Sequence, residues 1–225
     1  KTIKIRINFK ELVEKEKIVY RNMLSLVLLE ATKEFNTRRL IDIECENLYN
    51  IGVGAGTNLS GNYHLLSFNT TFLNEKYTEE GMNEKSLQFF LKFIFEPNVE
   101  DNKFFVQAFN NAKNILKEDI ESFEDVPSRM AFSRLYQNMC PDSPISYRPT
   151  GYIEDLEKIT PENLLKIKKI THGIHTHVTY LMGEKFLKHI APEVKDNFKY
   201  DEMCNNGFDI ELPYRNSQIV AEIKG

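Results

Sequence analysis

MLSLVLLEATKEFNTRRLIDIECENLY, Met23 to Tyr49, is the stretch of sequence that decides how this chain folds. Apolar residues crowd its first part and would cover most of the circumference of a helix, which predicts a helix buried on nearly every side. We expect this helix to run from about Glu16 to Phe35. Glu30 is the single carboxylate in the apolar run. Because a buried carboxylate is costly unless it is paired or functional, Glu30 either faces a wet edge or belongs to a site.

Length and composition indicate one large domain or two small packed ones. The chain has 225 residues, of which 41% are hydrophobic, and a formal net charge of −4. This mild charge argues against binding to nucleic acid or to a membrane surface, and no apolar run is long enough to span a membrane. Three widely spaced cysteines, Cys45, Cys140 and Cys204, favour free thiols in a reducing compartment. We therefore expect a cytoplasmic protein.

Alternating apolar residues predict an antiparallel sheet. Lys1–Phe9 alternates strictly, and the turn at Ser60-Gly61-Asn62 would join two further strands, Val53–Ser60 and Tyr63–Leu73, into a hairpin. Helical periodicity and helix-start signals separate the strands. The remaining expected elements are helices at Thr37–Tyr49, Glu84–Phe95, Asp101–Phe123, Pro127–Met139, Thr160–Ile170 and Gly183–Ile190, and strands at His177–Met182 and Ser217–Ile223. This order predicts an α+β fold, a mostly antiparallel sheet with helices packed on one face.

The order of these segments resembles the first half of an insulinase/pitrilysin-type metallopeptidase, the family that includes mitochondrial processing peptidase. GAGTNLSGNYHLLSF (Gly54–Phe68) is similar to the family's substrate-side hairpin. SYRPTGYIEDLEKITPENLLKIKK (Ser146–Lys169) is the most specific match, since it resembles the family's proline–glycine loop and the helix that opens with Thr-Pro-Glu. The resemblance covers roughly residues 1–190, expected to form one peptidase-like domain. Residues 191–225 would then be a linker and the opening strand of a second half.

Active members of that family carry H-x-x-E-H on the first helix, where two histidines bind zinc and the glutamate is the general base. The best placement of this motif here is Val27-Leu28-Leu29-Glu30-Ala31. Glu30 then occupies the position of the general base, while Val27 and Ala31 replace the histidines. The nearest counterpart of the third zinc ligand is Glu118. Since valine and alanine have no donor atoms, the resemblance implies a catalytically inactive chain without a metal or other cofactor.

Peptide binding is the function that this resemblance implies for an inactive chain. The glycine-rich arm, with Gly54, Gly56, Thr57 and Asn58, would hold an extended peptide of a peptide or protein substrate. The expected partner is a homologous catalytic subunit or a second half of the same protein. The resemblance extends to a bacterial branch of paired peptidase-like proteins in which one partner lacks the motif.

Two alternatives to peptide binding stay open. The first is an active zinc metallopeptidase with a non-standard site, built from His172, His175 and His177 with Glu30 or Glu118. Those histidines are also typical of a solvated loop and the start of a strand. The second alternative is a purely structural half of a longer chain. Lys166, Lys168 and Lys169, which precede the histidines, are typical of the solvent-exposed face of a helix. Cys45 is expected to pack in the core.

Overall fold

The fold is described by a computed structural model, which covers residues 1–141, 143–174, 176–180, 208–212 and 217–221. Side chains are described up to Ile167, apart from Asp142. None of the helices in these ranges is long and apolar enough to cross a membrane.

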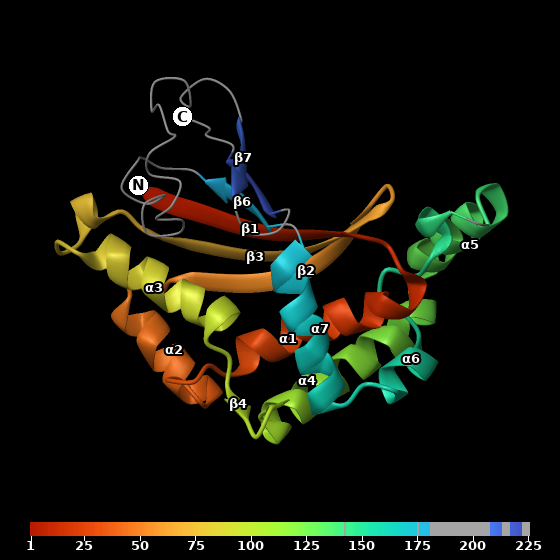
Figure 1. The fold of residues 1–225 in the computed structure, drawn as a ribbon, viewed down its shortest axis with the longest axis horizontal. Coiled ribbons are helices and arrows are strands. Elements are labelled where there is room, and N and C mark those ends of the chain that lie inside the picture. Colours follow the sequence, from red (N-terminus) through yellow and green to blue (C-terminus); the bar gives the residue numbers. More distant parts are fainter. Residues whose placement is uncertain (142, 175, 181–207, 213–216, 222–225) are drawn as a thin grey trace.

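A four-stranded antiparallel sheet forms one layer (Figure 1), in the order β2-β3-β1-β6. The register sets Ile7 of β1 opposite Phe68 of β3, and Phe68 opposite Ala55 of β2. The strands of this sheet are β1 (Thr2–Leu12), β2 (Gly52–Ser60), β3 (Tyr63–Leu73) and β6 (Thr176–Tyr180). The predicted first strand and hairpin are therefore confirmed.

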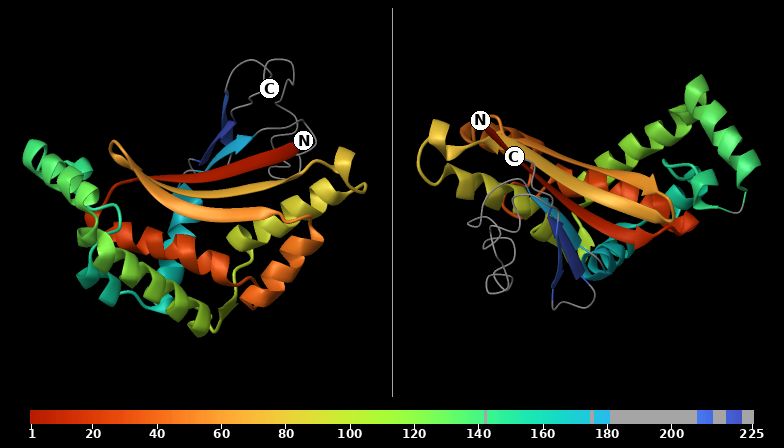
Figure 2. Two further views of the ribbon diagram at one scale, coloured as in Figure 1. Left: turned by 180° about the vertical axis from the view of Figure 1, so that it is seen from behind. Right: turned by 90° about the horizontal axis from the view of Figure 1, so that it is seen from above.

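Helices cover one face of this sheet (Figures 1 and 2), so the predicted α+β class is confirmed. The helices are α1 (Ile18–Glu30), α2 (Arg38–Asn47), α3 (Met82–Phe95), α4 (Val106–Glu121), α5 (Pro127–Met139), α6 (Ile153–Glu157) and α7 (Pro161–Ile174). Short 3-10 turns, η1 (Lys15–Lys17), η2 (Glu75–Tyr77), η3 (Ser122–Asp125) and η4 (Pro144–Ser146), connect some of them. Two short hairpins complete the described elements: β4 (Val99–Glu100) with β5 (Lys103–Phe104), and β7 (Phe208–Leu212) with β8 (Ser217–Ala221).

The core lies between the sheet and α1. Ile3, Ile5, Ile7 and Phe9 all point from β1 into it and are buried, as their alternation predicts. The Phe9 ring meets the Phe68 ring edge to face at 6.0 Å between centroids. On α1, the buried residues are Ile18, Val19, Arg21, Asn22, Met23, Leu24, Ser25, Val27 and Leu28.

Helix α1 ends at Glu30, so the predicted continuation to Phe35 is wrong. Ala31 has extended backbone angles, with φ −158° and ψ 144°. Its carbonyl accepts a hydrogen bond from the Asn98 amide at 3.4 Å, and the Lys33 amide donates to the Glu96 carbonyl at 2.8 Å. The chain leaves the helix because these residues pair with the segment that follows α3.

The long helix α4 begins at Val106, five residues later than the predicted Asp101. Asp101 and Asn102 have positive φ values of 49° and 58° and form the two-residue turn between β4 and β5. Two positive φ values are typical of the type I′ turn that favours Asn and Asp. At the C-terminal end, the predicted strand at Ser217–Ile223 is present as β8, and it pairs with β7, which was not predicted. The predicted helix at Gly183–Ile190 lies outside the described residues.

Candidate functional site

The end of α1 does not fit the placement of H-x-x-E-H at Val27–Ala31. On a helix, the two histidine positions lie one turn apart on the same face. Val27 is buried within α1, whereas Ala31 follows the last helical residue and has an extended backbone. Val27 and Ala31 therefore do not form the helical pair that the motif requires.

Glu30, the predicted general-base position, is half-buried at the end of α1. The Asn111 side-chain amide of α4 donates to its Oε2 atom at 3.3 Å. Glu118, the predicted third ligand, is exposed seven residues further along α4, which is about 10 Å at the rise of an α-helix. The structure thus separates the two carboxylates. Within the described residues, no group of three or more His, Cys, Asp or Glu side chains is arranged to hold a metal ion.

A buried polar cluster on α1 faces the edge of the sheet and was missed in the sequence. The Asn22 side-chain amide donates to the Pro149 carbonyl at 2.8 Å, and its Oδ1 atom accepts a hydrogen bond from the Thr57 hydroxyl of β2. The Ser25 hydroxyl donates to the Asn22 carbonyl at 2.7 Å. The only signal in the sequence is that Asn22 and Ser25, three residues apart, interrupt an apolar run. These neutral groups join α1, β2 and the proline–glycine loop.

A second buried polar group, around Arg21, joins α1 to β1 and β3. Its guanidinium donates to the His64 carbonyl at 2.5 Å and to the Phe9 carbonyl at 3.4 Å, and lies 3.2 Å from the Glu11 carboxylate. Burial lowers the pKa of Arg21, while Glu11 acts in the opposite direction. Burial, and secondarily the Arg21 charge, lowers the pKa of the His64 imidazole to about 3, so this side chain is neutral near pH 7.

Strand β2, which carries the predicted peptide-binding residues, lies at one end of the four-stranded sheet. The hydrogen bond of Thr57 to Asn22 shows that Thr57 faces the helices. Because side chains alternate along a strand, Gly54, Gly56 and Asn58 face the opposite side. A Cβ atom added at Gly56 would meet no atom within 4 Å, so that face is open there. The four predicted residues therefore share one strand but lie on two faces.

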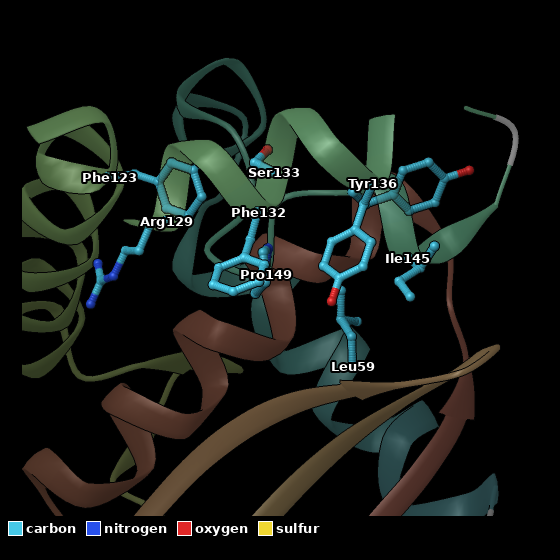
Figure 3. A pocket seen from close by; sticks show the side chains of 9 residues that line it. Leu59, Phe123, Arg129, Phe132, Ser133, Tyr136, Ile145 and Pro149 are labelled. Atoms are coloured by element: carbon cyan, nitrogen blue, oxygen red, sulfur yellow. The ribbon is translucent and has the colours of Figure 1, made fainter. Parts of the chain in front are cut away.

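An apolar pocket of about 390 Å³ lies between α5, η3, the loop after α5 and the end of β2 (Figure 3). Phe132 extends from α5 toward the loop that holds Pro149, and Leu59 is the residue of β2 that lines the pocket. Neither the pocket nor its residues were predicted. Its signal in the sequence is the pair of aromatic residues on Pro127–Met139, Phe132 and Tyr136, whose packing partner a pattern alone cannot identify.

The other predicted sites have mixed outcomes. His175 lies outside the described residues, and the side chains of His172 and His177 are not described, so the histidine cluster stays a prediction. Cys45 is half-buried against the core, as expected, and burial is the main cause that raises the pKa of its thiol.

Comparisons with known proteins were made at the level of sequence and of fold. No protein-family model matches the chain. A probable inactive metalloprotease of Bacillus subtilis (strain 168), YmfF, is 26% identical over 204 residues, which make up 90% of this chain and 48% of that protein. This chain thus spans about half the length of that relative.

Solved structures share this fold. A conserved protein from Enterococcus faecalis V583 superposes with a TM-score of 0.75 at 19% identity, over 96% of this chain and 48% of that one. The inactive domain of a peptidase M16 from Pseudomonas fluorescens gives a TM-score of 0.62 at 15% identity, over 86% of this chain and 45% of that one. The resemblance inferred from the sequence is confirmed: this chain is similar to a probable inactive metalloprotease and has the fold of an inactive M16 peptidase domain.

Proposed function

We propose that this chain is a non-catalytic, peptidase-like half that holds an extended peptide along the edge of β2 and works with a catalytic subunit or second half. The position of β2 carries the proposal. Among the described strands, β2 has a neighbour on one side only, where it pairs with β3. An edge strand presents a row of main-chain donors and acceptors that an extended peptide can pair with.

The register of the hairpin indicates which main-chain groups serve this edge. Ser60 and Tyr63 flank a two-residue turn at Gly61-Asn62, in which Gly61 has a φ of 56°. The residues that flank such a turn form a hydrogen-bonded pair, and such pairs alternate along the two strands. Ser60, Asn58, Gly56 and Gly54 therefore turn their amides toward β3. The residues whose amides and carbonyls point to the outer edge are Val53, Ala55, Thr57 and Leu59.

The predicted residues keep a role in this proposal, but a different one. Gly54, Gly56 and Asn58 share the outer face of the arm, which is open at Gly56, and Thr57 anchors the arm to α1 through Asn22. The space beside Gly56 leaves room for the peptide, while the main chain supplies the hydrogen bonds. Binding of this kind depends little on the identity of the peptide side chains.

We infer that the chain is not catalytic from the residues that α1 places level with Glu118. Figures 1 and 2 show α1 and α4 side by side and running in opposite directions. Since Glu30 meets Asn111, Glu118 is expected to lie near the level of Asn22 on α1. The segment with the spacing of H-x-x-E-H at that level is Asn22-Met23-Leu24-Ser25-Leu26. It contains neither the two imidazoles nor the carboxylate that zinc hydrolysis requires.

The partner in the proposal is a second peptidase-like half. The Bacillus subtilis relative and the Enterococcus faecalis structure are each about twice the length matched by this chain. Residues 1–190 are the peptidase-like unit of the proposal, and residues 191–225 link it to a second half. One strand edge buries little area, so binding by this half alone is expected to be weak.

The test of peptide binding is fluorescence anisotropy with a fluorescein-labelled extended peptide of nine residues, the length of β2, made of Thr, Ser and Lys. Ala55→Pro removes one outward amide without touching the ladder to β3 and should weaken binding at least severalfold. Ala55→Ser keeps that amide and should bind as the unchanged chain does. Equal binding by both variants, or no binding by the unchanged chain, would contradict the proposal.

The test of catalysis is metal analysis and peptide cleavage. We expect no stoichiometric zinc in protein purified without added metal and no cleavage by the chain alone. A homologous protein with an intact H-x-x-E-H should cleave peptides faster when this chain is present and should co-elute with it in size-exclusion chromatography. Zinc bound at Glu30 and Glu118 would instead support the active metallopeptidase.

A further inference from the structure

The buried amide of Asn22 has an orientation that its neighbours determine. Its nitrogen donates to the Pro149 carbonyl at 2.8 Å, and its Oδ1 atom accepts a hydrogen bond from the Thr57 hydroxyl. A carbonyl can only accept a hydrogen bond, so the Pro149 carbonyl requires the nitrogen end of the amide. The oxygen end is then turned toward β2, where it holds the Thr57 hydroxyl.

The loop that orients Asn22 is itself packed tightly on α1. Gly151 has a φ of 83°, and a Cβ atom added there would lie 2.9 Å from the Cβ atom of Val19. A side chain at this position would force the loop or α1 to move, so the close approach requires glycine. Val19 and Asn22 are three residues apart and share one face of the helix. Gly151 and Pro149 therefore fix the loop on that face.

Thr57 transmits this arrangement to the outer edge of the sheet. Its side chain faces Asn22, while the register directs its amide and carbonyl to the outer edge of β2. Val53 and Ala55, which also present main-chain groups to that edge, pack against the core through apolar contacts. A hydrogen bond is directional, whereas apolar contacts are not. A peptide that pairs with Thr57 would thus meet main-chain groups that α1 already holds in place.

We infer that Asn22 is a positioning residue for peptide binding: it holds Thr57, and with it the edge of β2, in an orientation set by the loop of Pro149 and Gly151. This inference rests on the proposed function and names the residue that prepares its binding edge. Asn22 acts without touching the peptide. A strand that is ordered before binding avoids the entropic cost that a loosened strand would incur on pairing.

The test compares two buried asparagines by fluorescence anisotropy with the labelled Thr/Ser/Lys peptide. Asn22→Ala should weaken binding about fivefold, the loss expected when one more group must be ordered on binding. Asn74, outside β2, is 9% exposed against 7% for Asn22, and its side chain accepts a hydrogen bond from the Lys76 amide at 3.0 Å. Asn74→Ala therefore removes a comparable amide and should leave the affinity for the peptide unchanged. Equal affinity of Asn22→Ala and the unchanged chain, or an equal loss in both variants, would overturn the inference.

Hydrogen exchange separates positioning of β2 from a general loss of stability. The amides of Gly56 and Asn58 turn toward β3 and exchange only when the strand opens. In Asn22→Ala without peptide, these two amides should exchange about tenfold faster, while those of Ile5 and Ile7 in β1 keep their rates. Equal acceleration in both strands, or none in β2, would show that Asn22 does not position the edge.

Gly151→Ala tests the loop as the source of the orientation. The added methyl group should displace the Pro149 carbonyl from Asn22 and weaken peptide binding, although Gly151 lies outside β2. In the Asn22→Ala background the same change should have no further effect on affinity, because the group through which it acts is gone. Additive losses would overturn the coupling through Asn22.

The outcomes distinguish this inference from the proposed function. Failure of the unchanged chain to bind the peptide would contradict both. Binding that is weakened by Ala55→Pro but not by Asn22→Ala would support the edge of β2 as the peptide site and overturn the role of Asn22 alone.

Discussion

Helices α1 and α5 have the same length, 13 residues, yet the fold uses them in opposite ways. Nine residues of α1 are buried, whereas no residue of α5 is. Both carry apolar side chains, but those of α5 include Phe132, Leu135 and Met139, which are exposed. An apolar residue on α1 therefore contributes to the stability of the chain, while these residues on α5 remain exposed. Figure 2 shows the difference in placement, since α5 projects from the body of helices under the sheet.

The largest expected effect is the loss of stability when a buried side chain of α1 is truncated. Leu28→Ala removes a fully buried side chain and should lower the free energy of unfolding by about 2–5 kcal/mol. The matched change on α5, Leu135→Ala, should stay within about 0.5 kcal/mol, since that side chain is half-exposed. Urea denaturation of both variants measures the difference. Equal losses would show that α5 is as much a part of the core as α1.

The polar cluster on α1 should contribute less than its apolar core. Asn22→Ala leaves the Thr57 hydroxyl and the Pro149 carbonyl without their partner, which should lower the free energy of unfolding by about 1–3 kcal/mol. Thr57→Val removes only one of these bonds and should have the smaller effect. A double-mutant cycle on Asn22 and Thr57 checks the coupling. Strictly additive effects would mean that their hydrogen bond does not hold β2 to α1.

The buried imidazole of His64 predicts that stability falls in acid. The folded-state pKa of about 3 lies below the ordinary value of 6.5, so the unfolded chain binds the proton more readily. The contribution is complete above pH 6.5 and is lost as the pH falls toward 3, with a slope of up to about 1.4 kcal/mol per pH unit. His64→Phe should reduce the slope of unfolding free energy against pH in this range. An unchanged slope would show that other groups cause it.

Local patterns predicted the elements that are specified by short-range signals in the sequence. The alternation of β1 and the turn at Gly61 specify a strand and a hairpin without further information, and Thr160 begins α7 as predicted. The end of α1 could not be predicted, because it depends on a hydrogen bond that the Ala31 carbonyl accepts from Asn98 and one that the Lys33 amide donates to Glu96, both more than sixty residues later. The polar cluster likewise depends on Pro149, 127 residues from Asn22.

The candidate site shows the same division. The glycine-rich arm was predicted from composition, and its place at the edge of the sheet follows only from the strand order. The pocket needs α5 to lie beside Leu59, which is more than sixty residues away from the helix. The placement of the H-x-x-E-H motif at Val27–Ala31 stays a prediction, and the apolar run alone could not show that the helix ends at Glu30, before the last position of the motif.

The smallest expected effect on stability is at Phe132, and it is the sharpest test of the difference between α1 and α5. The ring is 58% exposed and stacks on Tyr136 of the same helix, with centroids 6.4 Å apart. Phe132→Ala should therefore change the free energy of unfolding by less than about 0.5 kcal/mol, although truncation of a core phenylalanine costs about 3–5 kcal/mol. The matched core variant is Phe68→Ala, whose ring is fully buried against Phe9. A loss at Phe132 close to that at Phe68 would mean that another part of the chain covers the apolar face of α5.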